Sequence, residues 1–248
     1  MTAPVLLEVK GLQVERGGSL VLDIPSLCLN ENETVAIIGP NGAGKSSLLL
    51  SLANLIQVAS GSLFFRQQPI EFNRDETGYR RRLAMVFQEP LLFDATVAEN
   101  VGAGLKIRGM AKKEISRQVD ECMGRFRISH LAGRSARRLS GGEAQRTSLA
   151  RAFATEPELI LLDEPFSSLD PLARRDLIED LQKSLHSGGK TVTALIATHD
   201  REEVLNLAER VLVVEDGRII QSALPDAVMK QPASQFAEAF FGSNTPRH

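Results

Sequence analysis

Short apolar runs that recur along the chain predict a parallel sheet whose strands alternate with helices. Most of these runs are apolar at consecutive positions, as in strands that are covered on both faces. Because parallel strands need crossover connections, the segments between the runs are expected to be helical, with functional loops at the strand ends. The pattern predicts an α/β core. Its expected strands are residues 33–39, 83–88, 159–163, 191–198 and 211–215.

Other segments depart from this pattern and predict smaller parts around the core. Residues 6–15 and 61–66 are separated by polar turns and indicate an antiparallel β subdomain, whereas residues 97–154 indicate an inserted helical subdomain. Residues 226–241 predict one or two terminal helices. We expect one domain over residues 1–248, in which the core and β subdomain occupy about 1–96 and 155–220, the helical subdomain about 97–154, and a helical tail about 221–248.

Composition and charge narrow the class of protein without naming a partner. With 43 % hydrophobic and 24 % charged residues, the chain has ordinary globular proportions. A net charge of −2 provides no bulk attraction to nucleic acid or anionic lipid. Lys and Arg outnumber Asp and Glu between residues 106 and 151. This excess predicts either a basic binding face or, as we favour, ordinary solvated helix surfaces.

The cysteines and the apolar runs indicate the compartment. Cys28 and Cys122 lie far apart and form no CxxC pair, so a reducing cytosolic setting is expected. No apolar run approaches the roughly 18 to 20 residues that span a bilayer, and residues 1–4 do not begin a secretory signal. If the protein acts at a membrane, we expect another protein to anchor it.

A glycine-rich segment between an expected strand and an expected helix predicts a phosphate-binding loop. Glycines let backbone N–H groups surround phosphate oxygens, Lys45 would reach the β and γ phosphates, and Ser46 would coordinate Mg²⁺. The flanking elements disfavour the alternative, an ordinary glycine-rich turn. The residues expected to bind ATP are Gly39, Pro40, Asn41, Gly42, Ala43, Gly44, Lys45, Ser46 and Ser47.

Two adjacent carboxylates at the end of a later apolar run predict the hydrolytic chemistry. Asp163 is placed to hold Mg²⁺, directly or through water. Glu164 lies one residue further into the loop, where an attacking water would sit. The alternative is a strand that simply ends in solvent, and the phosphate loop makes it the weaker interpretation. We therefore expect ATP hydrolysis with Glu164 as the general base.

Residues 139–146, Leu-Ser-Gly-Gly-Glu-Ala-Gln-Arg, are much more specific than the phosphate loop. With them the chain resembles the ABC ATPase family over nearly all of its length. The family's other motifs follow in order: Gln88 after a strand, residues 167–170 after the carboxylates, and residues 198–200 after a later strand. Independently of the resemblance, Ser140 is a favourable helix N-cap, and the two glycines after it allow close backbone approach.

The resemblance implies that two subunits pack head to tail with two ATP molecules between them. It implies that Gln88 contacts Mg²⁺ and the attacking water and senses a transmembrane partner, that His199 contacts the γ-phosphate, and that Asp170 couples the two sites. A polar strand end and a structural histidine are the simpler interpretations of Gln88 and His199 taken alone. The implied catalytic residues are Glu164, His199 and Gln88, the signature and dimer residues are Ser140, Gly141, Gly142, Glu143 and Asp170, and the Mg²⁺ ligands are Ser46, Gln88 and Asp163.

The sequence departs from the family pattern at two positions. Arg16 stands where family members usually place an aromatic residue that stacks on adenine, and the chain's single tyrosine is Tyr79. A guanidinium can stack on an aromatic ring, so Arg16 is either a weaker adenine platform or a solvated turn residue. Glu143 stands where glutamine is commoner, and this change is not expected to disable phosphate binding by Ser140 and the glycines.

The resemblance implies an ATP-hydrolysing subunit of a membrane transporter. A free-standing ATPase domain resembles the subunits of bacterial importers, and overall the chain is similar to importers of tungstate- and molybdate-type oxyanions. Residues 88–101 would face a permease, although their apolar side chains fit an ordinary core equally well. The implied partners are a second ATPase subunit, identical to this one, transmembrane permease subunits and an extracytoplasmic solute-binding protein, with no nucleic acid. This places the protein peripherally at the cytoplasmic face of the cell membrane.

Two other functions stay open at this point. An efflux motor can also be free-standing. A soluble ABC protein of DNA repair, translation or metal-cluster assembly is less favoured, because the sequence has no tandem ATPase domain, long coiled coil or zinc-finger cysteine cluster. A regulator that never hydrolyses ATP is disfavoured by the presence of Glu164 and His199.

Overall fold

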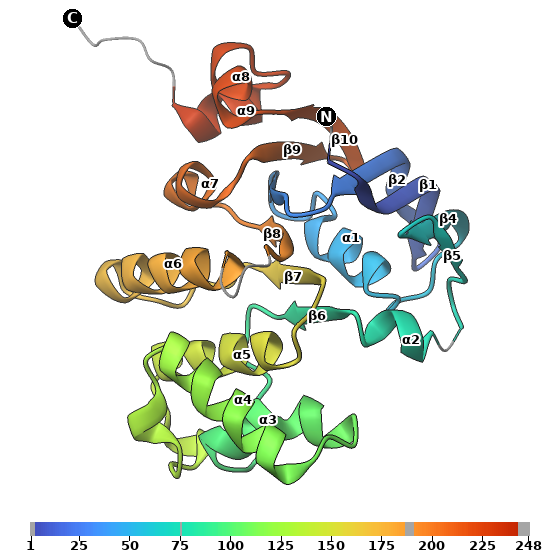
Figure 1. The fold of residues 1–248 in the computed structure, drawn as a ribbon. Coiled ribbons are helices and arrows are strands. Elements are labelled where there is room, and N and C mark those ends of the chain that lie inside the picture. The colour runs from blue at the N-terminus through green and yellow to red at the C-terminus, as the bar shows by residue number, and fades with distance from the viewer. Residues whose placement is uncertain (1–2, 75, 187–190, 243–248) are drawn as a thin grey trace, which may run out of the picture. The chain divides into compact units, whose positions relative to one another are not determined.

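The computed structural model describes residues 3–74, 76–186 and 191–242, and the chain forms two compact units (Figure 1). The first unit combines Met1–Arg80 with Thr193–His248, and the second is Arg81–Val192. The expected subdomain boundaries stay a prediction. The end of the expected tail, residues 243–248, and the first two residues of the expected signal-free start lie outside the described residues.

An antiparallel sheet in order β2-β1-β4-β5 forms one part of the first unit. Burial alternates in two stretches of β1, residues 7–10 and 11–15, as expected for a strand with one covered face. Its partner β2 runs antiparallel to it and was not expected from the sequence. The strands are β1 (Val5–Arg16), β2 (Ser19–Asn30), β4 (Ser60–Phe65) and β5 (Gln68–Ile70).

Four further strands of the first unit lie in the order β10-β9-β3-β8. β3 is parallel to both β8 and β9, while β10 is antiparallel to β9. Every residue of β3 and β8 is buried, which explains their consecutive apolar residues. These strands are β3 (Thr34–Ile38), β8 (Thr193–Ala197), β9 (Arg210–Glu215) and β10 (Arg218–Ala223).

The helices of the first unit pack around these strands. A buried cluster joins the terminal helices to the strands that hold the phosphate loop: Val228 and Phe241 pack with Ile38 and Val213. The tail is therefore part of the core. The helices are α1 (Lys45–Leu52), α2 (Thr77–Arg80), α7 (Arg201–Leu207), α8 (Pro225–Lys230) and α9 (Gln235–Phe241).

The second unit contains a parallel strand pair and a group of helices. β6 pairs in parallel with β7, and α3, α4 and α5 contact one another (Figure 1). Residues 97–154 are thus largely helical, as the sequence indicates. The elements are β6 (Leu83–Val86), α3 (Val97–Ile107), α4 (Lys112–Arg125), the 3₁₀ turns η1 (Ser129–Leu131) and η2 (Ala136–Arg138), α5 (Gly141–Ala154), β7 (Leu159–Asp163) and α6 (Pro171–Leu185).

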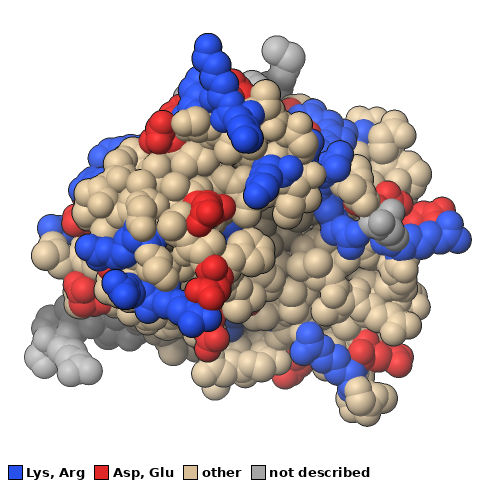
Figure 2. Space-filling view, turned by 90° about the horizontal axis from the view of Figure 1, so that it is seen from below, with Lys and Arg blue, Asp and Glu red and all other residues tan. Residues whose placement is uncertain are grey.

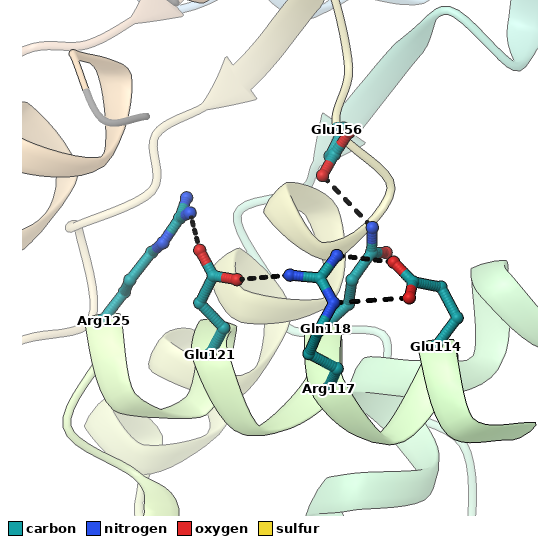
Figure 3. Close-up of polar contacts among 6 residues, drawn as sticks. All are labelled: Glu114, Arg117, Gln118, Glu121, Arg125 and Glu156. Carbon is teal, nitrogen blue, oxygen red and sulfur yellow. Dashed lines mark hydrogen bonds and ion pairs between the residues drawn. The ribbon is translucent and has the colours of Figure 1, made fainter. Parts of the chain in front are cut away.

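Several basic residues of the helical region form ion pairs with acidic side chains. On α4, Arg117 contacts Glu114 and Glu121, and Arg125 contacts Glu121 (Figure 3). On the face shown in Figure 2, Lys and Arg side chains are interspersed with Asp, Glu and uncharged surface. These features favour solvated helix surfaces over a basic binding face.

The state of the cysteines and the character of the helices can also be described. Both cysteines are free thiols, Cys28 exposed and Cys122 buried, and burial raises the pKa of Cys122 to about 11. Within the described residues, no helix has the length and apolar character to span a bilayer.

Candidate functional site

The phosphate loop connects the buried strand β3 to α1, and its backbone requires glycine at defined positions. Gly42 and Gly44 have positive φ values of 81° and 100°, a region that L side chains disfavour. A Cβ at Gly39 would lie 2.1 Å from the carbonyl oxygen of Val214 on β9. The turn after β9 also supports the loop, because the Gly217 N–H donates to the Ala43 carbonyl at 3.1 Å.

Lys45 is the first residue of α1, and its side chain folds back over the loop. Its Nζ donates to the carbonyl oxygens of Gly39 at 2.8 Å and Pro40 at 3.1 Å, and the residue is only 7 % exposed. A buried ammonium group therefore lies at a helix N-terminus, where the helix dipole also favours anions. This arrangement suits the triphosphate of a nucleotide.

Gly39 provides a sharp test of this loop. We expect Gly39→Ala to lower the stability by about 1–3 kcal/mol, because the new Cβ must push against a strand carbonyl. The displaced loop is expected to bind ATP about tenfold more weakly, which equals about 1.4 kcal/mol. The measurements are thermal unfolding and an equilibrium ATP titration.

The matched control is Gly124→Ala on α4, where an added Cβ would meet no atom within 4 Å. This control is expected to bind ATP as the parent does. Unchanged ATP affinity in Gly39→Ala would show that the close approach to Val214 does not shape the site.

His199 lies at the same sheet edge as the phosphate loop, within the first unit. β8 runs parallel to β3, and the Thr198 N–H donates to the Ile37 carbonyl at 3.0 Å. The turn of residues 198–200 is also held by side-chain contacts. The Thr198 hydroxyl contacts buried Glu203 and accepts the Asp200 N–H at 3.0 Å. The structure thus brings His199 to the strand ends from which the phosphate loop departs.

Gln88, Asp163 and Glu164 lie at one sheet edge of the second unit. β6 and β7 pair in parallel with Val86 opposite Leu162, so Asp163, the last residue of β7, and Gln88, which follows β6, lie at neighbouring strand ends. Gln88 is exposed, whereas both carboxylates are partly buried. The two strand ends therefore place these three residues along one edge of the strand pair.

The backbone of Glu164 adopts an unusual conformation. Its φ is 44°, in the left-handed region that non-glycine residues rarely occupy. The following turn holds it there, because the Ser167 hydroxyl and N–H donate to the Glu164 carbonyl at 3.0 and 3.3 Å. Such strained positions cluster at functional sites, and nothing in the sequence indicates this one.

The signature segment forms a closed capping box at the start of α5. The Glu143 N–H donates to the Ser140 hydroxyl oxygen at 3.3 Å, and the Ser140 N–H donates to Glu143 Oε2 at 2.8 Å. Hydrogen bonding from the Ser140 backbone, and the charge of Arg134, hold the pKa of Glu143 below its usual range. Helix α5 begins at Gly141, and Ser140 is its N-cap as expected.

The two signature glycines are not required by the packing of this chain. A Cβ at Gly141 would meet no atom within 4 Å, and one at Gly142 would lie 3.4 Å from Leu169, at ordinary contact distance. Both φ values lie outside the left-handed region. Leu169 precedes Asp170, which caps α6 by accepting the N–H groups of Leu172 at 3.1 Å and Ala173 at 3.0 Å. Asp170 thus has a structural role in addition to the predicted coupling.

A buried ion-pair network, which the sequence pattern did not predict, contacts α5, the helix that follows the signature segment. Asp180 on α6 is 2 % exposed and contacts Arg146 of α5 and, at 2.7 Å, Arg127. Arg146 also donates to the Phe126 carbonyl at 3.1 Å. The sequence signal for this network is Asp180, an acidic residue at a core-facing position of α6. This position can be recognised only after α6 has been placed in the structure.

The hairpin that carries Arg16 offers no aromatic platform for adenine. Arg16 is the exposed last residue of β1, and the first aromatic residue of the chain is Phe64. Tyr79 is buried, donates to the Leu52 carbonyl and packs edge-on against Phe65. Tyr79 therefore belongs to the core, and the stacking role of Arg16 stays a hypothesis.

Comparison with known proteins is consistent with these features. Residues 22–167 match the ABC transporter family. The chain is 39 % identical over 243 residues to the Fe(3+) ions import ATP-binding protein FbpC of Streptomyces coelicolor, covering 96 % of this chain and 68 % of the relative. It is 38 % identical over 241 residues to the sulfate/thiosulfate import ATP-binding protein CysA of Nitrosomonas europaea, covering 95 % and 65 %. The chain thus spans about two thirds of the length of these relatives.

A solved structure agrees with the fold. The ATP-binding cassette MJ0796, described as a dimeric post-hydrolysis state bound to ADP and Pi, superposes with a TM-score of 0.78 and 27 % identity over 88 % of this chain and 98 % of that one. The expected α/β architecture is thereby confirmed. The match of the family over 22–167, together with relatives of more than 30 % identity, shows that the chain belongs to the ABC transporter family as an ATP-binding, ATP-hydrolysing domain.

Proposed function

We propose that this chain is the ATP-hydrolysing motor subunit of a membrane importer and that it works as a dimer. The observation that carries the proposal is the pair of adjacent, partly buried carboxylates, Asp163 and Glu164, at the end of β7 in a chain of the ABC family. Support for import comes from the relatives, whose names describe import ATP-binding proteins. The competing functions are efflux and a soluble, non-transport role.

The proposed reaction is in-line attack of water on the γ-phosphate of ATP. The water oxygen forms a bond to γ-phosphorus, the bond to the β–γ bridging oxygen breaks, and ADP leaves. Glu164 accepts the proton of the water, while Lys45 and His199 stabilise the charge that develops on the phosphate oxygens. Gln88 would orient the water from the neighbouring strand end.

The residues available for a metal suit Mg²⁺. Mg²⁺ is usually held by one or two protein oxygens together with substrate phosphates and water. The Ser46 hydroxyl, the Asp163 carboxylate and the Gln88 side-chain carbonyl are oxygen donors of this kind, and Asp163 is only partly exposed at its strand end. When bound there, Mg²⁺ would neutralise phosphate charge.

Dimerisation is supported by the signature glycines. Gly141 and Gly142 are not needed by the packing or backbone conformation of their own chain, so their small size is best explained by close approach of another molecule. The N-terminus of α5 would bind the phosphates of ATP held by a partner subunit. The cassette MJ0796, to which this chain is similar, is described as a dimer.

A rigid apolar patch in the second unit suits a permease. Leu91 and Phe93, which we call the Leu91/Phe93 patch, are 57 % and 56 % exposed. Arg151 stacks over the Phe93 ring and donates to the Leu91 carbonyl at 2.7 Å. Buried Asn100 bonds both the N–H and the carbonyl of Phe93. Because these contacts hold the backbone of an exposed apolar segment and the ring of Phe93, we assign the patch to a permease segment.

The names of similar proteins bear on the cargo. We propose a small solute, such as an inorganic oxyanion, because one of the similar proteins is named for sulfate and thiosulfate. Another is named for Fe(3+), so similarity alone does not select the cargo. An importer of this kind would place the chain at the cytoplasmic face of the membrane, beneath a permease served by an extracytoplasmic solute-binding protein.

Capture of the complex tests the proposal. The Glu164→Gln protein would be held in its native membranes with ATP, crosslinked gently and purified, and its companions identified by mass spectrometry. We expect a polytopic permease and a solute-binding protein. Adding Phe93→Asp is expected to lower permease recovery at least about tenfold, because it buries a charge in an apolar contact. The matched control is Ile107→Asp, which changes an apolar residue that is 76 % exposed outside the patch.

The outcomes separate the candidate functions. Recovery of a permease without a solute-binding protein would favour efflux. Recovery with only soluble nucleic-acid or ribosomal partners would contradict the transporter function and leave the ATPase activity intact. Equal loss of the permease in Phe93→Asp and Ile107→Asp would contradict the assignment of the patch.

A further inference from the structure

The N-terminus of α5 carries a carboxylate where the proposed dimer would bind an anion. Glu143 accepts the Ser140 N–H with Oε2 at 2.8 Å and lies beside the hydroxyl that it helps to position. The Ser140 backbone hydrogen bond keeps the pKa of Glu143 low, so this carboxylate is ionised at neutral pH. A negative charge therefore stands next to the expected docking point of a triphosphate.

The second oxygen of Glu143 is engaged by an arginine. Arg134 Nη1 lies 3.1 Å from Glu143 Oε1, and the two side chains are 46 % and 28 % exposed. One carboxylate oxygen of Glu143 thus accepts the hydrogen bond of the capping box, and the other pairs with Arg134. The electrostatic effect of His130 also lowers the pKa of Glu143, to a smaller extent.

The backbone that carries Arg134 is held independently of this ion pair. The Arg134 N–H donates to the Leu131 carbonyl at 2.8 Å, and the Arg134 carbonyl accepts the Val97 N–H of α3 at 3.0 Å. The neighbouring Ser135 forms a bridge with Thr96. Removing the guanidinium should therefore leave the loop and the cap in place, and change chiefly the charge at the start of α5.

We propose that Arg134 is a positioning residue that neutralises Glu143 so that ATP held by a partner subunit can dock against Ser140 and the signature glycines. The inference rests on the proposed dimer. An uncompensated carboxylate would repel the triphosphate and weaken the favourable field of the helix N-terminus. A glutamine at this position would keep the capping box without needing a counter-charge, so Arg134 and Glu143 form a matched pair.

A double-mutant cycle tests this pair in the full-length Glu164→Gln protein. The measured quantity is the ATP concentration that gives half-maximal dimerisation, followed by light scattering. Arg134→Gln is expected to raise it about five- to tenfold, because repulsion is no longer offset. Glu143→Gln is expected to lower it. The double variant is expected to lie within about twofold of Glu143→Gln alone, since the arginine then has no charge to compensate.

Two further measurements separate charge compensation from a structural role. High salt is expected to reduce the effect of Arg134→Gln, because these groups are partly exposed and their repulsion is screened. Thermal unfolding without nucleotide is expected to change little. The control is Arg117→Gln on α4, which removes the same kind of side chain from two more exposed ion pairs (Figure 3) and is expected to dimerise like the parent.

The outcomes distinguish this inference from the proposed function. If the Glu164→Gln parent stays monomeric at saturating ATP, the dimer and this inference both fail. If the parent dimerises but Arg134→Gln behaves like Arg117→Gln, or its defect persists unchanged beside Glu143→Gln, only the role of Arg134 is overturned.

Discussion

Glu164→Gln is expected to lower steady-state ATP turnover by at least about a thousandfold while ATP binding is retained, because the general base is lost and the shape of the site is kept. The glutamine side chain has nearly the same size and can adopt the same backbone conformation. The loss therefore measures proton acceptance by Glu164. Phosphate release and equilibrium ATP binding are the two measurements.

The control for this variant is Glu238→Gln, which removes one carboxylate from an exposed position on α9. Its turnover is expected to match that of the parent. Sustained turnover by Glu164→Gln at a normal rate would reject Glu164 as the general base and assign proton acceptance to another group.

Asp180→Ala is expected to destabilise the protein by about 3 kcal/mol, because it removes the only carboxylate paired with the largely buried guanidinium of Arg146 among the contacts described. Asp180 is almost fully buried, and the Arg146 side chain is 15 % exposed. For a chain of this size, the loss corresponds to a fall in Tm of about 6–12 °C. Since Arg146 lies on α5, we also expect weaker ATP-driven dimerisation.

The neighbouring residue supplies the control for Asp180. Glu179 is exposed and lies 3.8 Å from Lys183, so Glu179→Ala is expected to change the stability by less than about 0.5 kcal/mol. Equal melting temperatures for the two alanine variants would show that the buried network does not hold α5.

The phosphate loop illustrates what local sequence can predict. Its glycines, Lys45 and the flanking strand and helix all lie within a short stretch, so the pattern specifies both the fold and the chemistry of that segment. The clash that a Cβ at Gly39 would make with Val214 joins residues far apart in sequence. This constraint cannot be predicted without knowing that β9 packs beside β3.

Other parts of the site could not be predicted for related reasons. The left-handed backbone of Glu164 has no signal in residue type, because glutamate normally avoids that conformation. The contact between Thr198 and buried Glu203 depends on the turn that follows β8. β2 was missed because its alternation is interrupted by Pro25 and polar residues, whereas the structure pairs it along β1.

The family motifs predicted more of the function than the physical patterns did alone. Ser140 as an N-cap follows from residue type, and the capping box with Glu143 follows from their spacing. The ion pair with Arg134 does not, because the loop between η1 and η2 has no regular period. The ion pair with Arg134, which only the structure reveals, therefore bears on how Glu143 can stand where the family usually has glutamine.

In the proposed function, ATP is bound between two copies of this chain before it is hydrolysed. The most direct test is the mass of the Glu164→Gln protein in Mg²⁺ and saturating ATP, measured by light scattering together with the amount of bound nucleotide. We expect a dimer that retains two ATP molecules and returns to monomer when ATP is removed. A monomer that binds one ATP without associating, at any accessible protein concentration, would contradict it.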